Sequence, residues 1–261
     1  MRYLGETFSM RFIILFIFFL SLPLLSYTPG KWSYKDQFIL SKSTKGPSKE
    51  IIRNGEGLVI YVAEYRYSED GHLLQESYSD KEGKSDGKTI FLYKDGLIVS
   101  EESYGANDSL VEKKEFFYKN NILKKMVAKN GEGNIQIQYT LSAEKNGAVI
   151  AGEGKNSESN DVESFKFMID PKRPNVQIQT LLDDKKKTLG EIHFKYDAKG
   201  NLVEREFFQG EVHRINKLKY KTDGSLESFT FHVKRGDTWV LEKTHTLVYE
   251  DSNRSKVTKK D

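Results

Sequence analysis

The chain has 261 residues, with 41 lysines and arginines, 38 aspartates and glutamates, no cysteine and 12% aromatic residues. Its net charge of +3 excludes a strongly basic nucleic-acid-binding protein, and its aromatic content excludes a disordered chain. The lack of cysteine excludes disulfides, thiolate metal sites, thiol nucleophiles and lipid attachment through an N-terminal cysteine. The length allows a sizeable core in one large domain or two ordinary ones.

Residues 1–30 have the pattern of a secretory signal peptide. Residues 12–20 are all apolar and follow a basic start, and Ser21 and Pro23 then interrupt the run. A membrane-spanning helix needs about 18–20 unbroken apolar residues. The shorter run therefore favours export with cleavage over an uncleaved anchor.

We expect the mature chain to begin between Ser26 and Trp32, after translation from Met1 or Met10. Export without any disulfide suits a bacterial envelope better than a eukaryotic secretory route. The sequence therefore predicts an exported protein that is periplasmic or associated with the outer membrane or cell surface.

A repeated pattern organises the remaining chain. Residues 31–59 are expected to form N-terminal lead-in strands, residues 60–250 a repeat domain, and residues 251–261 a flexible tail. In the repeat domain, an apolar residue two positions before a Tyr recurs about every 26 residues, with one degenerate copy within 142–190. The second positions of these units are Tyr67, Tyr93, Tyr118, Tyr139, Ile169, Tyr196, Tyr220 and Tyr249.

Turn residues follow several of these positions at a fixed distance. Asp-Gly and similar pairs tolerate the positive φ of tight hairpin turns, and the flanking runs alternate with period 2. The turn glycines of the clearest units are Gly71, Gly96, Gly200 and Gly224. The pattern predicts an all-β protein, an antiparallel meander of about eight β-hairpin repeats rolled or folded into an elongated sheet with two lysine-rich edges.

Alternation also assigns the two faces of this sheet. Each Tyr shares a face with the apolar residue two positions before it, and we expect that face to be covered. An alternative leaves the aromatic rows open as a platform for sugar rings or a partner protein. The residues between each pair, which define a mixed opposite face, are Arg66, Leu92, Phe117, Gln138, Met168, Lys195, Lys219 and Val248.

One segment resembles a known repeat family. Residues 196–202 read Tyr-Asp-Ala-Lys-Gly-Asn-Leu, similar to the Tyr-Asp-x-x-Gly-x-Leu core of the tyrosine-aspartate (YD) repeats of the Rhs and teneurin families. Residues 67–73 share the spacing without the Asp, and residues 83–97 are similar to MORN-like variant repeats. The resemblance implies stacked β-hairpins over roughly residues 60–250 and implies no chemistry.

The candidate reactive motifs do not assemble into a catalytic site. Residues 83–89 depart from a phosphate-binding loop, because three residues separate the glycines and a strand follows. Glu101–Glu102 and Asp183–Asp184 are adjacent, so in a strand they point to opposite faces. The basic runs at residues 185–187 and 254–260 read as a solvated turn and a frayed terminus, with contact to anionic lipid or polysaccharide as the alternative.

Histidines are the remaining candidate. Four histidines lie in the C-terminal half, with separations of 20, 19 and 13 residues: His193, His213, His232 and His245. These separations partly follow the repeat, so a ladder of imidazoles on one edge of the sheet is conceivable. His72 lies in the N-terminal half, apart from the other four. Scattered strand or surface histidines are the preferred interpretation, and no metal site is expected.

The sequence therefore predicts a non-catalytic, exported structural or binding protein of a bacterial envelope, part of a periplasmic or surface assembly, with a protein or glycan partner. It predicts no enzyme activity, no cofactor and no nucleic-acid partner, and it leaves open oligomerisation and proximity to a membrane surface. The alternative is a periplasmic carrier that holds a lipid or glycan in the groove of a curled sheet. A carrier should contain a continuous apolar cavity, and an assembly protein a filled interior.

Overall fold

The computed structural model describes residues 46–249, except residues 146–147, 158 and 160–161. The expected signal peptide and C-terminal tail lie outside the described residues. Among the described residues, no helix is long and apolar enough to span a bilayer.

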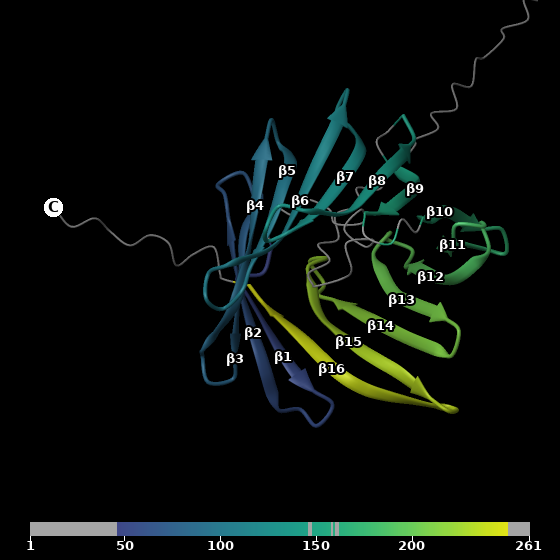
Figure 1. Cartoon of the computed structure of the whole chain (residues 1–261). Helices are drawn as coiled ribbons and strands as arrows, with labels where there is room; N and C mark the ends of the chain where they lie inside the picture. Colours follow the sequence, from purple (N-terminus) through teal and green to yellow (C-terminus); the bar gives the residue numbers. More distant parts are fainter. Residues whose placement is uncertain (1–45, 146–147, 158, 160–161, 250–261) are drawn as a thin grey trace, which may run out of the picture.

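The described chain is all-β and antiparallel, as the sequence predicts, but the sheet closes on itself (Figure 1). Each strand pairs with its neighbours in sequence, and the first strand pairs with the last. The strands are β1 (Lys49–Asn54), β2 (Val59–Tyr67), β3 (Leu73–Asp80), β4 (Ser85–Lys94), β5 (Leu97–Tyr104), β6 (Leu110–Lys119), β7 (Ile122–Asn130), β8 (Ile135–Ala143), β9 (Val149–Asn156), β10 (Val162–Asp170), β11 (Arg173–Leu182), β12 (Thr188–Tyr196), β13 (Leu202–Gln209), β14 (Val212–Tyr220), β15 (Leu226–Arg235) and β16 (Thr238–Val248).

The 26-residue repeat is a hairpin of one even-numbered and one odd-numbered strand. The first unit is β2–β3 and the seventh is β14–β15, while the eighth unit supplies only β16. Strand β1, from the lead-in segment, takes the place of the missing partner, because Glu50 lies opposite Leu247 on one side and Ala63 on the other. The expectation of an elongated sheet with two edges is therefore corrected: the lead-in strand closes the meander into a barrel of sixteen strands.

A five-residue turn recurs at both ends of the barrel. In each copy the fourth residue has positive φ and its amide donates to the carbonyl of the first. In the YD-like unit, Asp197 Oδ1 also accepts hydrogen bonds from the amides of Lys199 and Asn201. The predicted turn glycines Gly71, Gly200 and Gly224 occupy the fourth position, and Gly96 lies in a two-residue turn, all with positive φ. Glycine reaches this conformation without steric strain, so the turns fix where each hairpin reverses.

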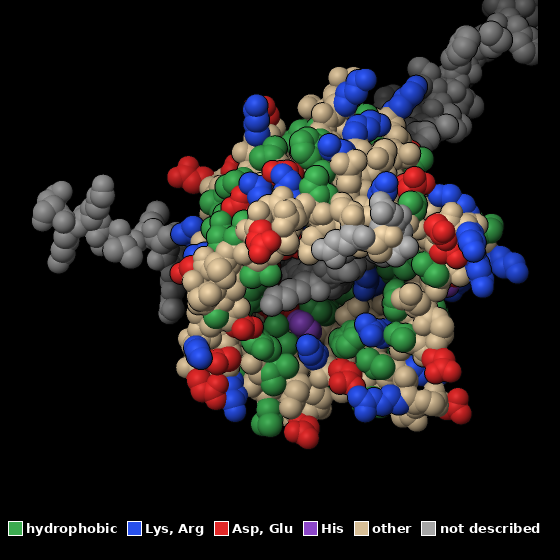
Figure 2. All heavy atoms as spheres, in the orientation of Figure 1, with side chains coloured by type: hydrophobic (Ala, Val, Ile, Leu, Met, Phe, Trp, Pro, Cys, Tyr) green, Lys and Arg blue, Asp and Glu red, His purple; other side chains and the backbone are tan. Residues whose placement is uncertain are grey.

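The two faces of the sheet differ sharply in exposure. The residues two positions before the repeat positions are buried, or half-buried in the degenerate unit, where the residue is Phe167. All eight intervening residues, from Arg66 to Val248, are exposed. In a closed sheet the covered face is the one that lines the interior, so we call the face of the repeat positions the inner wall and the opposite face the outer wall. Figure 2 shows charged side chains spread over the outside, around a central hollow.

Candidate binding site on the outer wall

The outer wall carries a row of aromatic rings across strands β12 to β16. Phe208 on β13 lies directly opposite His213 on β14 and Glu191 on β12. Trp239 on β16 lies opposite Lys234 on β15. On its other side, Lys234 lies opposite His213 on β14, because the β14–β15 register continues by one pair. Because opposite residues share a face, these side chains project from the same side of five neighbouring strands.

The rings are in direct contact along this row. The centroid of His193 lies 5.0 Å from that of Phe208, which lies 4.3 Å from that of His213. His213 meets Trp239 at 4.5 Å in an edge-to-face arrangement. Trp239 is 36% exposed, and the other rings are half-buried. We call His193, Phe208, His213 and Trp239 the aromatic row.

Two carboxylates orient the imidazoles of the aromatic row. Glu191 lies 2.8 Å from His193 Nε2, and Glu206 lies 2.6 Å from His213 Nε2. The Glu191 side chain is 41% exposed. The row therefore places the partly exposed Trp239 ring and three half-buried rings beside hydrogen-bond acceptors, residue types that can pack on a sugar ring and bind its hydroxyl groups.

The same region contains one further histidine, His232, whose pKa is lowered. His232 lies opposite Ile215 on the outer wall, and its Nδ1 is buried with no partner among the described residues. Burial lowers the pKa of His232, and the nearby charge of Lys217 lowers it further. A neutral His232 adds apolar surface beside the aromatic row rather than charge. Within the described residues, no cluster of three or more His, Asp or Glu side chains has the arrangement of a metal site.

The repeat tyrosines lie on the inner wall and join consecutive units. Tyr220 donates its hydroxyl to the carbonyl of Leu202 at 2.9 Å, and Tyr249 donates to Leu226 at 2.8 Å. Tyr67 makes the equivalent bond to Pro47, just before β1, at 3.0 Å. Each of these tyrosines therefore holds the start of an odd-numbered strand of the adjacent unit, which is a structural role.

The other repeat positions vary in burial. Tyr139 is fully buried, Ile169 is 56% exposed, and Tyr93, Tyr118 and Tyr196 are half-buried. Burial raises the pKa of Tyr93 and of Tyr196 to about 12. The exposed position is the degenerate unit, where the hydroxyl needed for the inter-unit bond is missing.

A polar strip interrupts the apolar inner wall on strands β16 to β6. Glu50 accepts a hydrogen bond from Tyr65 and lies against His245. Lys114 forms a buried ion pair with Glu101 at 2.7 Å. Desolvation by burial raises the pKa of Glu76 to about 7, against the opposing effect of a hydrogen bond from Tyr78, and the charges of Glu50 and Glu101 add to the rise.

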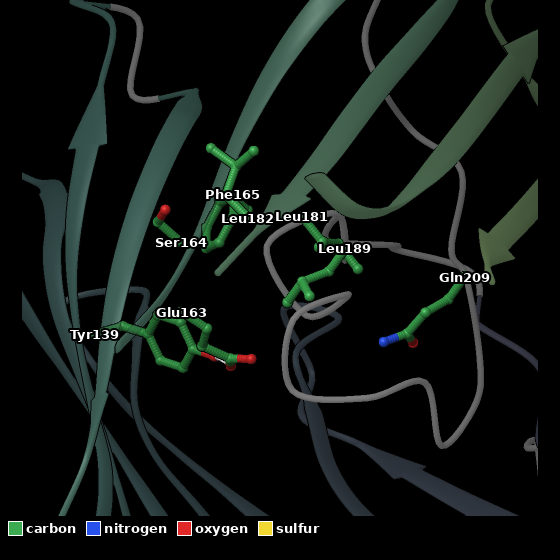
Figure 3. Close-up of a pocket in the computed structure, with 8 residues that line it drawn as sticks. All are labelled: Tyr139, Glu163, Ser164, Phe165, Leu181, Leu182, Leu189 and Gln209. Atoms are coloured by element: carbon green, nitrogen blue, oxygen red, sulfur yellow. Dashed lines mark hydrogen bonds between the residues drawn. The ribbon is translucent and has the colours of Figure 1, made fainter. Parts of the chain in front are cut away.

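A small pocket lies where β8 and β10 to β13 meet (Figure 3). Tyr139 donates a hydrogen bond to Glu163 at one side, and Leu189 and Gln209 lie at the other. Its volume is about 60 Å³, against the 300–1,000 Å³ that ligand pockets usually offer. This pocket has room for water and none for an acyl chain or a sugar ring.

The other motifs singled out in the sequence occupy structural positions. Glu101 points to the inner wall and pairs with Lys114, while Glu102 points outward and pairs with Lys113. Residues 83–89 run from a hairpin turn into β4, and residues 183–187 form a turn in which Lys186 pairs with exposed Glu153. None of these motifs contributes to the aromatic row.

Sequence reasoning missed the aromatic row. The spacing of His193 and His213 hinted at an imidazole ladder, and the structure places the two on neighbouring hairpins with Phe208 between them. Nothing in the local sequence indicated Trp239, because it reaches the row only through the β14–β15 and β15–β16 registers.

Comparisons with known proteins show the fold alone. No protein-family model matches the chain, and neither does any curated protein sequence. A crystal structure of a porin-like protein from Bacteroides uniformis matches with a TM-score of 0.52 at 11% identity, covering 79% of this chain and 98% of that one. A porin-like protein from Bacteroides vulgatus matches with a TM-score of 0.44 at 10% identity, covering 78% and 99%. The first match supports the closed all-β architecture; the YD resemblance stays a proposal that rests on its motifs.

Proposed function

We propose that this protein is an exported, non-catalytic binding protein of a bacterial envelope, and that the aromatic row is its glycan-binding surface. The observation that carries the proposal is the continuous contact of His193, Phe208, His213 and Trp239 on the outer wall, beside Glu191 and Glu206. The signal-peptide pattern of residues 1–30 supports export, and the porin-like fold is compatible with an envelope location.

The outer wall is suited to water rather than to lipid. Cross-strand ion pairs lie along it, including Lys195 with Glu204 at 3.0 Å and Lys129 with Glu115 at 2.6 Å. A membrane-embedded barrel presents an apolar outer band about 25 Å tall, where each outward Lys or Arg costs roughly 2–4 kcal/mol at the midplane. We therefore infer that the barrel stands in an aqueous compartment of the envelope, where its outer wall is open to a partner.

The carrier alternative has less support. The pocket at Tyr139 and Glu163 is too small for an acyl chain or a sugar ring. The closed sheet also has no free strand edge to which a partner strand could add. The outer wall carries the partly exposed Trp239 ring, and we seek the binding surface there.

Titration of the purified protein with soluble envelope oligosaccharides, including peptidoglycan fragments, tests the proposal. We expect saturable binding by calorimetry, weakened at least about tenfold, or roughly 1.4 kcal/mol, by Phe208→Ala or Trp239→Ala. Phe117→Ala is the matched control, because Phe117 is 43% exposed on the same outer wall and lies outside the row. Binding that is absent for every oligosaccharide, or that is reduced equally by the control, would contradict the assignment.

A further inference from the structure

The closing strand β1 is held to both of its neighbours through one buried side chain. Glu50 is the only buried residue of β1 and is 2% exposed. One of its carboxylate oxygens lies 2.5 Å from Nδ1 of His245 on β16, and the other accepts the hydroxyl of Tyr65 on β2. A carboxylate only accepts hydrogen bonds, so both neighbours supply the protons. Glu50 therefore bridges the two seams, β1–β2 and β1–β16, along which the barrel closes.

The side-chain contacts on the outer side of β1 are weaker. Lys49 forms an ion pair with Glu64 at 3.2 Å, and both side chains are exposed. Arg53 donates to the hydroxyl of Thr246 at 3.3 Å. Exposed ion pairs contribute little to stability, and β1 has only six residues with which to form ladder hydrogen bonds. The hold of β1 on its neighbours therefore depends on the state of its buried carboxylate.

Tyr65 connects Glu50 to a second buried carboxyl group. It lies directly opposite Glu76 of β3 on the inner wall, and a hydrogen bond with its hydroxyl acts on the pKa of Glu76. This hydroxyl has a single proton, so it cannot donate to both carboxylates at once. When Glu76 is protonated, its own hydroxyl can donate to the Tyr65 oxygen while Tyr65 donates to Glu50. A proton on Glu76 therefore completes a chain of hydrogen bonds from β3 to β1.

The surroundings keep that proton on Glu76 up to about neutral pH. Desolvation is the main cause of the rise in the pKa of Glu76 to about 7, and the charges of Glu50 and Glu101 add to it. A hydrogen bond from Tyr78 opposes the rise. Lys114 on β6 is paired with Glu101 at 2.7 Å. Above neutral pH, the strip therefore gains a further buried negative charge next to the carboxylate that holds β1.

We propose that β1 is a proton-controlled latch: it closes the barrel while Glu76 holds a proton, and it leaves the seams when that proton is lost. Ionised Glu76 and Glu50 compete for the one hydroxyl proton of Tyr65, and moving β1 away returns both carboxylates to water. Opening exposes the strand edges of β2 and β16, to which another chain can add. The latch is independent of glycan binding by the aromatic row.

Spin labels on either side of β1 test the latch, because the chain has no cysteine of its own. The seam pair is Glu64→Cys with Val248→Cys in the mature protein. Both positions are exposed on the outer wall, and both lie opposite Lys49 of β1. The backbones at the two positions are two strand spacings apart, or about 10 Å. Dipolar electron spin resonance measures the distance between the labels at pH 6 and at pH 8.

The matched control pair flanks a strand away from the seams. Lys195→Cys and Lys217→Cys are exposed on the outer wall and lie opposite Glu204 of β13. We expect the seam pair to gain a population with longer distances at pH 8 and the control pair to keep its distance. A group with a pKa of about 7 is ionised in about a tenth of the molecules at pH 6 and in about nine tenths at pH 8. The open population should therefore rise by up to about tenfold.

Two variants assign the opening to the hydrogen-bond chain. Glu76→Gln should keep the seams closed at pH 8, because the glutamine amide can donate to Tyr65 and does not ionise. Tyr65→Phe should give an open population at both pH values, because Glu50 then loses its donor from β2. The wild-type protein and Glu76→Gln decide the proposal even where Tyr65→Phe does not fold.

Four results would overturn the latch. Unchanged seam distances between pH 6 and pH 8 would mean that β1 stays paired whatever the charge of Glu76. Opening that persists in Glu76→Gln would assign it to another group, such as His245. Equal lengthening in the seam and control pairs would mean general unfolding. A folded Tyr65→Phe protein with closed seams at both pH values would show that the shared hydroxyl does not hold β1.

Discussion

At the scale of single residues, Glu76 links the interior of the barrel to pH. Its pKa is raised from 4.5 to about 7, mainly by desolvation, and Glu50, Glu101, Tyr65 and Tyr78 face it from neighbouring strands. Between pH 4.5 and 7, the folded protein therefore keeps a proton on Glu76 that the unfolded chain has already lost. The unfolding free energy is highest at low pH and falls as pH rises from about 4.5 to beyond 7.

The expected loss of unfolding free energy across that range is on the order of 3 kcal/mol. Glu76→Gln should remove this pH dependence, because glutamine keeps the shape and does not ionise. Urea unfolding of both proteins at pH 5, 6, 7 and 8 measures it. Parallel pH profiles for the two proteins would assign the dependence to other groups.

The repeat tyrosines and their neighbours should respond differently to truncation. Tyr196 is a half-buried inner-wall residue packed against the cluster around Phe194, whereas Lys195 is an exposed outer-wall residue paired with Glu204. We expect Tyr196→Ala to cost roughly 3 kcal/mol, as for other truncated core aromatics, and Lys195→Ala no more than about 0.5 kcal/mol. Thermal melts of the two variants compare them. Small effects from both would favour an open aromatic platform over a covered inner wall.

At the scale of strands, β9 depends on two glycines. A side chain at position 152 or 154 would overlap the rings of Phe165 and Tyr139, which lie over this strand on the inner wall. Glycine weakens a strand in general, so its presence here is explained by the close approach of the rings.

Gly154→Ala should therefore lower the unfolding free energy by roughly 1–3 kcal/mol, as overpacking does in other cores. Glu153→Ala, between the two glycines and pointing outward, is the control and should change it by no more than about 0.5 kcal/mol. Chemical denaturation of both variants measures the difference. A neutral Gly154→Ala would show that the Tyr139 ring can move aside.

Strand positions were predictable from sequence because their signals are local. The Tyr position, the turn residue and the period-2 alternation located hairpins such as β2–β3 and β12–β13, and assigned Phe194 and Lys195 to opposite faces. The closure was not predictable, because residues 49–54 carry no signal that distinguishes a lead-in strand from a partner for a strand almost 200 residues away. The aromatic row was missed for the same reason, since its members meet only through the register of five strands.

At the scale of the whole molecule, the barrel depends on one short strand. β1 has six residues and pairs with β2 on one side and β16 on the other. A central strand cannot accept proline without losing a ladder hydrogen bond. If β1 fails to pair, the meander becomes an open sheet with the exposed edges of β2 and β16, which are templates for pairing with other chains.

Ile51→Pro should therefore convert the protein into associating species while leaving most hairpins formed. We expect light scattering after size-exclusion chromatography to show dimers or larger assemblies, and far-ultraviolet circular dichroism to remain dominated by β-structure. Lys81→Pro is the control, because Lys81 is an exposed residue at the second position of the β3–β4 turn, where proline is favoured. A monomeric Ile51→Pro protein with wild-type stability would mean that the β1–β16 pairing does not hold the barrel closed, and that the hairpin stack keeps its curvature without it.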